Sequence, residues 1–210
     1  MYLYSTCTCT CLFCCKANYK MKILLVACLV AVCSATPPVS NIPQTFCGSG
    51  EGGFNNIKSG KFLMCLDNVN HMMVGISTDE QGKLTSETLF RYDSKISHMD
   101  YYITGQEGEG DEHCDSQSHN VTFKLHPFFE WVKSATYGGQ KKIKEMNYDI
   151  WKSDANGNLE LAVAPGNPNV PVYFTVQEDI SHSMEFHFMS FNATISDPKV
   201  FDVPSVCKEF

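Results

Sequence analysis

The chain has 210 residues, of which 16 are basic and 23 acidic, so its formal net charge at pH 7 is −7. This excess of negative charge argues against binding to nucleic acid or to anionic membrane surfaces, because both recruit basic proteins. The length suffices for one domain with a substantial hydrophobic core.

The N-terminal part of the chain has the features of a secretory signal peptide that begins at an internal methionine. Lys20-Met21-Lys22 leads into an uncharged apolar run at residues 23–32, and the small residues Cys33-Ser34-Ala35 follow. The run is shorter than the ~20 apolar residues that span a bilayer. We therefore predict a signal peptide at residues 21–35 and a secreted, extracellular protein. The lysosomal lumen is the alternative, since no address signal separates the two.

Residues 1–20 precede the expected start at Met21, and we predict that they are a non-native or upstream-translated extension. Cysteine and threonine alternate between Cys7 and Cys11. This alternation lacks the paired C-x2–4-C spacing of a zinc site, so we do not expect metal there.

Four of the eleven cysteines follow the predicted cleavage site, namely Cys47, Cys65, Cys114 and Cys207. An even number of cysteines in a secreted chain predicts two disulfides, and three connectivities are open on this count alone. Residues 1–35 hold three lysines and no acid, so cleavage leaves 13 basic and 23 acidic residues, a net charge of −10.

The remaining chain reads as an irregular arm followed by a single β domain. Residues 36–56 are rich in Pro, Gly, Ser and Asn, which predicts the arm. Residues 57–210 show short alternating apolar runs separated by turn signals such as Asn156-Gly157, which predicts antiparallel sheet. One or two short helices are expected, the clearest at residues 127–137 before Gly138-Gly139. The predicted strands lie at residues 62–66, 72–76, 89–92, 99–103, 121–125, 146–150, 159–163, 170–176 and 184–188.

Several predicted strands are apolar on both faces. Met184, Phe186 and Phe188 alternate on one face, and Met189 and Phe191 fall on the other. A sheet with two apolar faces is covered on both, or one face lines a cavity. Periodicity alone does not choose between an ordinary core and a ligand cavity. We expect the two tryptophans, Trp131 and Trp151, to be packing residues.

Two sequons predict N-glycosylation, at Asn120 and at Asn192. An acidic stretch at residues 107–115 precedes the first sequon. Its carboxylates offer oxygen ligands, which makes Ca²⁺ the candidate cofactor. A solvated acidic loop is the alternative reading of that stretch. The calcium candidates are Glu107, Glu109, Asp111 and Glu112.

No catalytic signature is present in the sequence. The G-x-S-x-G elbow, H-E-x-x-H and the P-loop are all missing. We therefore predict that the protein is not an enzyme.

The C-terminal residues follow the pattern D-P-x-x-F-x-x-P-x-x-C, from Asp197-Pro198 through Phe201 and Pro204 to Cys207. Tyr137-Gly138-Gly139 and Asp149-Ile150-Trp151 come earlier in the chain. In this order the motifs resemble those of the ependymin-related family, over roughly residues 45–207.

The resemblance implies a mainly β fold similar to the LolA/LppX-type lipoprotein carriers. In that fold a strongly curved antiparallel sheet, or two stacked sheets, forms a half-barrel with an apolar pocket. It further implies a non-enzymatic secreted or lysosomal glycoprotein, often a homodimer, with calcium association and a lipid-like ligand. The family pattern pairs Cys114 with Cys207, which leaves Cys47 with Cys65. This chain lacks a cysteine between Cys114 and Cys207 that vertebrate members have.

These observations favour a secreted glycoprotein that binds a hydrophobic small molecule or lipid in the half-barrel pocket. The alternative is a calcium-dependent adhesion glycoprotein that binds an extracellular-matrix protein and whose pocket has no function. The candidate pocket walls, which an ordinary core would also explain, are Tyr148, Trp151, Phe174, Phe186 and Phe188.

Overall fold

The computed structural model describes residues 41–54, 60–93, 98–105, 112–120, 123–154, 158–177 and 183–208. The predicted extension at residues 1–20 and signal peptide at residues 21–35 lie outside the described residues. The part of the chain that is described is mainly β, as predicted. Within the described segments, eleven strands form one antiparallel sheet, which is not closed into a barrel.

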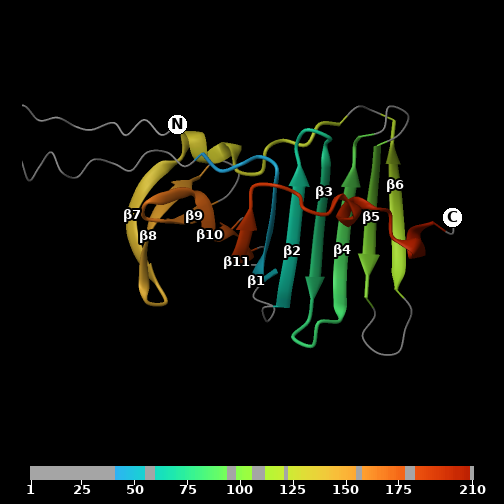
Figure 1. Cartoon of the computed structure of the whole chain (residues 1–210), viewed down its shortest axis with the longest axis horizontal. Coiled ribbons are helices and arrows are strands. Elements are labelled where there is room, and N and C mark those ends of the chain that lie inside the picture. The colour runs from blue at the N-terminus through green and yellow to red at the C-terminus, as the bar shows by residue number, and fades with distance from the viewer. Residues whose placement is uncertain are drawn as a thin grey trace, which may run out of the picture. The chain divides into compact units, whose positions relative to one another are not determined.

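The sheet consists of two meanders that meet in the middle (Figure 1). The strand order is β6-β5-β4-β3-β2-β1-β11-β10-β9-β8-β7, so β6 and β7 form the two edges. The strands are β1 (Phe46–Phe54), β2 (Gly60–Asp67), β3 (Met72–Thr78), β4 (Leu84–Arg91), β5 (His98–Thr104), β6 (His113–His119), β7 (Thr136–Ile143), β8 (Met146–Ser153), β9 (Asn158–Ala164), β10 (Asn167–Gln177) and β11 (Ser183–Asn192). Three short 3₁₀ helices are η1 (Glu130–Ser134), η2 (Pro198–Phe201) and η3 (Ser205–Cys207).

Strand β1 corrects the prediction of an irregular arm at residues 36–56. It lies at the centre of the sheet, between β2 and β11. Its glycines resemble a loop in the sequence, but they are needed where β1 meets β11. A Cβ on Gly48 would lie 2.7 Å from the Phe188 ring, and one on Gly50 would collide with the carbonyl oxygen of His187. The β domain therefore begins before residue 57.

Two predictions between β5 and β8 are wrong. The strand expected at residues 121–125 is displaced, because β6 ends at His119 and residues 123–127 have no regular structure. The helix expected at residues 127–137 is only η1, and β7 begins at Thr136.

Gly138-Gly139 marks a β-bulge in β7, not the end of a helix. Gly139 has φ of 86°, and the pairing with β8 shifts between Tyr137 and Gln140. The side chains of these two residues both donate to the buried carboxylate of Asp149, at 3.0 and 3.1 Å. The glycine pair thus allows a bend that satisfies a buried acid.

Two segments cover opposite faces of the sheet. Residues 123–135, here called the strap, connect β6 to β7, and their side chains Phe129 and Val132 are buried in the main core. Residues 193–208, here called the tail, run from β11 across β2–β6 (Figure 1). Phe201 of the tail is buried against Val74 and Leu89 on the other face. We call the two faces the strap face and the tail face.

The main core lies on the strap face and is largely aromatic. Phe46 is fully buried, and its ring lies 5.5 Å from that of Phe129 and 5.0 Å from that of Phe191. A bulge opposite Ser49 and Gly50 turns Phe191 toward this core, so its predicted place on the opposite face from Phe188 is wrong. Trp151 is 2% exposed, and it packs in the core as predicted.

Candidate functional site

A hollow of about 270 Å³ lies on the strap face, between strands β2–β4, β11 and the strap. Most of its walls are apolar side chains of β2, β3 and β11, and the strap contributes Phe128. The lining residues are Phe62, Leu63, Met64, Met73, Gly75, Ile76, Ser77, Ser86, Thr88, Phe128, Met184 and Phe186.

Gly75 creates part of this space. It lies in the middle of β3, paired with Met64 of β2 and Thr88 of β4. A Cβ at this position would meet no atom within 4 Å, whereas a Cβ on Gly48 or Gly50 would collide with β11. A glycine inside a strand weakens the strand, and it often marks a site where a ligand or another backbone segment approaches closely. The backbone at Gly75 therefore lines open space that a ligand can occupy.

The walls of the hollow differ in chemistry from one side to the other. Ser77 pairs with Ser86 across β3 and β4, and Thr88 lies next to Gly75, so this side carries three hydroxyl groups. The opposite side is built by Phe62, Phe186 and flexible methionines. None of the described residues that line the hollow is charged.

The predicted pocket walls are mostly elsewhere in the protein. Phe186 lines the hollow, but Trp151, Phe174 and Phe188 are packed in the main core. Tyr148 lies in a separate cluster with Ile150 and Ala162. Periodicity indicates which residues share a face, but it does not indicate where that face is left unfilled. The signal that was missed is a lone glycine inside an apolar strand, Gly75.

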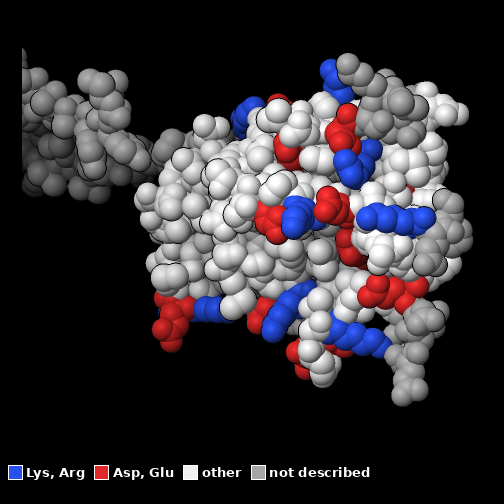
Figure 2. Space-filling view, turned by 45° about the vertical axis from the view of Figure 1, so that its right-hand side comes forward, with Lys and Arg blue, Asp and Glu red and all other residues white. Residues whose placement is uncertain are grey.

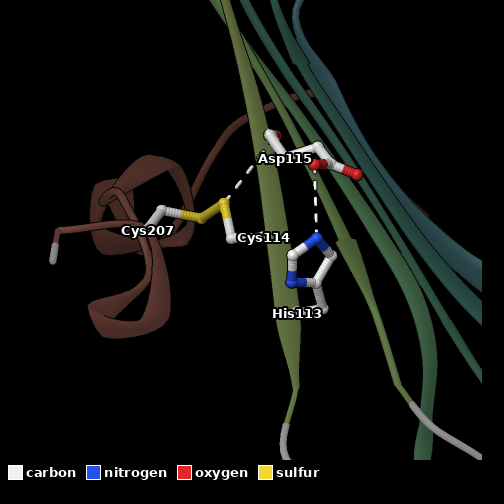
Figure 3. The surroundings of a disulfide bond; sticks show 4 residues. All are labelled: His113, Cys114, Asp115 and Cys207. Carbon is white, nitrogen blue, oxygen red and sulfur yellow. Dashed lines mark hydrogen bonds and ion pairs between the residues drawn. A yellow bond between two sulfur atoms is a disulfide. The ribbon is translucent and has the colours of Figure 1, made fainter. Parts of the chain in front are cut away.

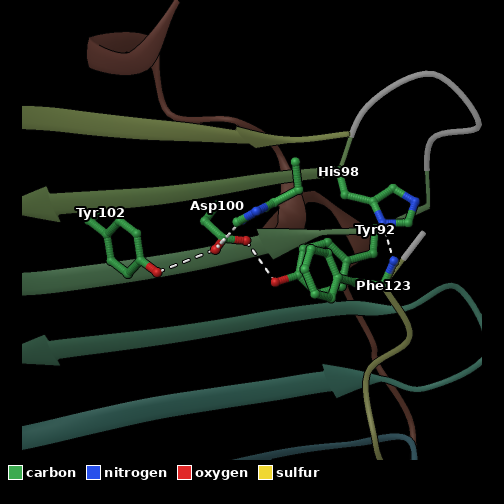
Figure 4. Close-up of polar contacts among 6 residues, drawn as sticks. Tyr92, His98, Asp100, Tyr102 and Phe123 are labelled. Carbon is green, nitrogen blue, oxygen red and sulfur yellow. Dashed lines mark hydrogen bonds and ion pairs between the residues drawn. The ribbon is translucent and has the colours of Figure 1, made fainter. Parts of the chain in front are cut away.

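A polar cluster lies on the same face, at the β4–β6 end of the sheet (Figure 4). Its centre is Asp100, which is only 6% exposed. The hydroxyl of Tyr92 donates to Asp100 Oδ1 at 2.7 Å. Nε2 of His119 lies 2.8 Å from Oδ2, and the hydroxyl of Tyr102 lies 3.4 Å from it. Several hydrogen bonds thus compensate for the burial of this charge.

The polar cluster also holds the start of the strap. The backbone N–H of Phe123 donates to Nδ1 of the buried His98 at 2.7 Å (Figure 4). A nitrogen that accepts this bond carries no proton. The ring of Tyr92 stacks on His98, with centroids 5.3 Å apart. Burial, followed by the hydrogen bond to Asp100, raises the pKa of Tyr92 well above its usual range.

The structure joins the four described cysteines as the resemblance implies. Cys47 and Cys65 are register partners on β1 and β2, with Cα atoms 4.1 Å apart. Cys114 of β6 is bonded to Cys207 in η3, with Cα atoms 5.4 Å apart. Figure 3 shows the sulfur of Cys114 directed away from the side chains of His113 and Asp115. The second bond ties the end of the tail to an edge strand.

The predicted glycosylation sites are at exposed positions. Asn120 follows β6 directly, although Val121 and Thr122 of its sequon lie outside the described residues. Asn192 is the last residue of β11 and is exposed as well.

Three of the calcium candidates, Glu107, Glu109 and Asp111, lie outside the described residues, and Glu112 is exposed. Across the described ranges, no three His, Cys, Asp or Glu side chains converge into a metal-binding group. Burial, and then the charge of Glu112, raises the pKa of Glu87. On the face seen in Figure 2, acidic and basic side chains are interspersed, and neither sign forms a continuous patch.

No helix within the described segments is long and apolar enough to cross a membrane. A comparison of the chain with protein-family models and another with curated proteins found no match. The resemblance to ependymin-related proteins therefore remains a prediction from the motifs of the chain itself.

Proposed function

We propose that the protein is a secreted, non-enzymatic glycoprotein that binds a slender hydrophobic molecule in the hollow on the strap face. The observation that carries this proposal is the open space above Gly75, which is surrounded mostly by apolar side chains. The two disulfides and the exposed sequon asparagines support the secreted part.

The size of the hollow favours a narrow ligand. Its volume of about 270 Å³ falls just below the range of roughly 300–1,000 Å³ that is typical for sites of drug-sized ligands. It exceeds the roughly 150 Å³ of an apolar cavity that accommodates benzene. Burial of apolar surface is favourable by about 25 cal/mol per Å², so the transfer of an alkyl chain from water into the hollow lowers the free energy.

The residues around the hollow suit entry and adjustment. Met64, Met73 and Met184 have unbranched, flexible side chains, which adapt to guests of different shape. Phe128 belongs to the strap, which has only one short 3₁₀ helix and is not part of the sheet. In the proposed cycle, a small shift of the strap admits and releases the ligand.

The test is binding of the uncharged fluorescent probe N-phenyl-1-naphthylamine by protein secreted from eukaryotic cells. Gly75→Leu places a side chain into the hollow and is expected to abolish binding. Ser116→Leu adds a similar side chain at an exposed position of β6 and should leave binding unchanged. Equal probe binding by wild type and Gly75→Leu would refute the hollow as the binding site. Native mass spectrometry of the wild type should also reveal a co-purified lipid.

The calcium-dependent adhesion function depends on acidic residues of which only Glu112 is described. It stays a prediction, as do the matrix partner, calcium itself and the homodimer.

A further inference from the structure

We propose that the hollow selects amphiphiles whose polar end is an uncharged hydroxyl group, in preference to those with an anionic head. This inference rests on the proposed function and specifies its ligand class. The geometry that carries it is the placement of hydroxyl groups and carboxylates on the strap face of β3–β6.

The first step concerns the wall of the hollow itself. The only polar side chains among its described lining residues are Ser77, Ser86 and Thr88, and all three lie on the β3–β4 side. A hydroxyl group donates one hydrogen bond and accepts others. The hydroxyl groups of this wall can therefore bind a ligand hydroxyl whether it acts as donor or as acceptor. An ionised carboxylate in the hollow would find no cationic partner, and an unpaired buried charge is far more costly than a hydroxyl.

The second step concerns the sheet beyond that wall. Thr88 pairs with Tyr102 of β5, and Tyr102 pairs with Asp115 of β6. Neighbouring strands lie about 4.8 Å apart, which places Asp115 roughly 10 Å from Thr88. Asp100, one position further along β5 on the same face, is a second carboxylate. A ligand head that leaves the hollow toward β5 and β6 therefore approaches negative charge.

The third step is the lack of compensating cations. The strap-face positions of β4–β6, as far as the structure describes them, hold no Lys or Arg. The two histidines nearest to the carboxylates are engaged by them, His119 with Asp100 at 2.8 Å and His113 with Asp115 at 3.3 Å. The lining of the hollow and the strap-face positions of β4–β6 therefore offer an anionic head no Lys or Arg partner.

The experiment measures displacement of N-phenyl-1-naphthylamine by three ligands with the same twelve-carbon chain. These are 1-dodecanol, dodecyltrimethylammonium and dodecanoate, used below micelle formation at a pH of about 8, where a carboxylic acid is ionised. We expect dodecanol to bind at least about tenfold more tightly than dodecanoate. The trimethylammonium compound should fall between them, because it meets carboxylates but forms no hydrogen bond.

Two variants locate the source of this selection. Thr88→Val keeps the shape of the wall but removes a hydroxyl group. It should lower the affinity for dodecanol by about three- to tenfold and have little effect on the affinity for dodecanoate. Thr136→Val, at an exposed position of β7, is its control. Asp115→Lys should reduce the difference in affinity between dodecanol and dodecanoate. Glu145→Lys makes the same change of charge in the exposed β7–β8 turn and should leave this difference unchanged.

The outcomes separate this inference from the proposed function. The selection would be overturned if dodecanol and dodecanoate bound with equal affinity, or if Thr88→Val lowered both affinities by the same factor. Either result would leave a ligand site in place. Probe binding that is absent, or unaffected by Gly75→Leu, would overturn the proposed function itself.

Discussion

The two ends of the strap face are stabilised in different ways. Around β1, β2 and β8–β11 the face is a packed aromatic core, in which Phe46 and Trp151 are almost fully buried. Across β4–β6 the same face carries a hydrogen-bonded cluster around Asp100. The strap touches both, through Phe129 in the core and Phe123 in the cluster. The hollow lies between them, where neither packing nor hydrogen bonding fills the space.

The largest effect is expected in the aromatic core. Phe46→Ala should lower the free energy of unfolding by about 3–5 kcal/mol, because a fully buried ring leaves a cavity. Phe123→Ala removes a ring that is 39% exposed and should cost clearly less. Urea unfolding followed by tryptophan fluorescence measures both. Similar losses for the two variants would contradict the distinction between the two ends.

In the polar cluster, His98→Leu should lower the free energy of unfolding by about 1–3 kcal/mol. The variant leaves the backbone N–H of Phe123 without its acceptor. Hydrogen exchange at this amide should accelerate more than exchange in β9. His113→Leu, at an exposed position on β6, is the control and should change neither quantity. Unchanged exchange at Phe123 in His98→Leu would show that the strap is held by packing alone.

The polar cluster should also weaken at high pH. The raised pKa of Tyr92 means that the folded state favours the neutral phenol. Its contribution to stability is present below the ordinary tyrosine pKa of about 10 and is lost as the pH rises above that value. The urea midpoint of the wild type should therefore fall more steeply between pH values of about 9 and 12 than that of Tyr92→Phe. Parallel curves would mean that Tyr92 ionises equally easily in both states.

The smallest effect is expected from Glu160 of β9, whose carboxylate forms ion pairs with two lysines on the face opposite to the aromatic core. Burial raises the pKa of Glu160, but the ammonium groups of Lys141 and Lys152, at 2.7 and 3.1 Å, outweigh it and hold the pKa below its usual value. A lowered pKa stabilises the fold above the ordinary pKa and is lost as the pH falls through the folded value. Glu160→Gln should cost less than about 1 kcal/mol at neutral pH, because both lysines are exposed. Thermal unfolding at several pH values should show this difference vanish in acid; a constant difference would point to packing instead.

The sequence predicted the sheet better than it predicted the site. Alternation identified β3, β5, β8 and β9 because their apolar residues have a period of two. It failed for β1, whose glycines fit against β11 and have no side chain to alternate. It failed for β6 as well, since its strand is polar on both faces. Gly75 was overlooked because open space in a fold depends on residues distant in sequence, such as Phe128 and Met184.

The open sheet has consequences for solubility, because unpaired strand edges invite intermolecular pairing and aggregation. Edge strand β7 carries Lys141 and Lys142, and its bulge at Gly139 interrupts regular pairing. Edge strand β6 is rich in polar residues, and the Cys114–Cys207 bond keeps the tail beside it. A reducing environment would break the Cys114–Cys207 bond and free the tail from β6. The exposed edge of β6 would then be the starting point for strand pairing between molecules and fibril-like assembly.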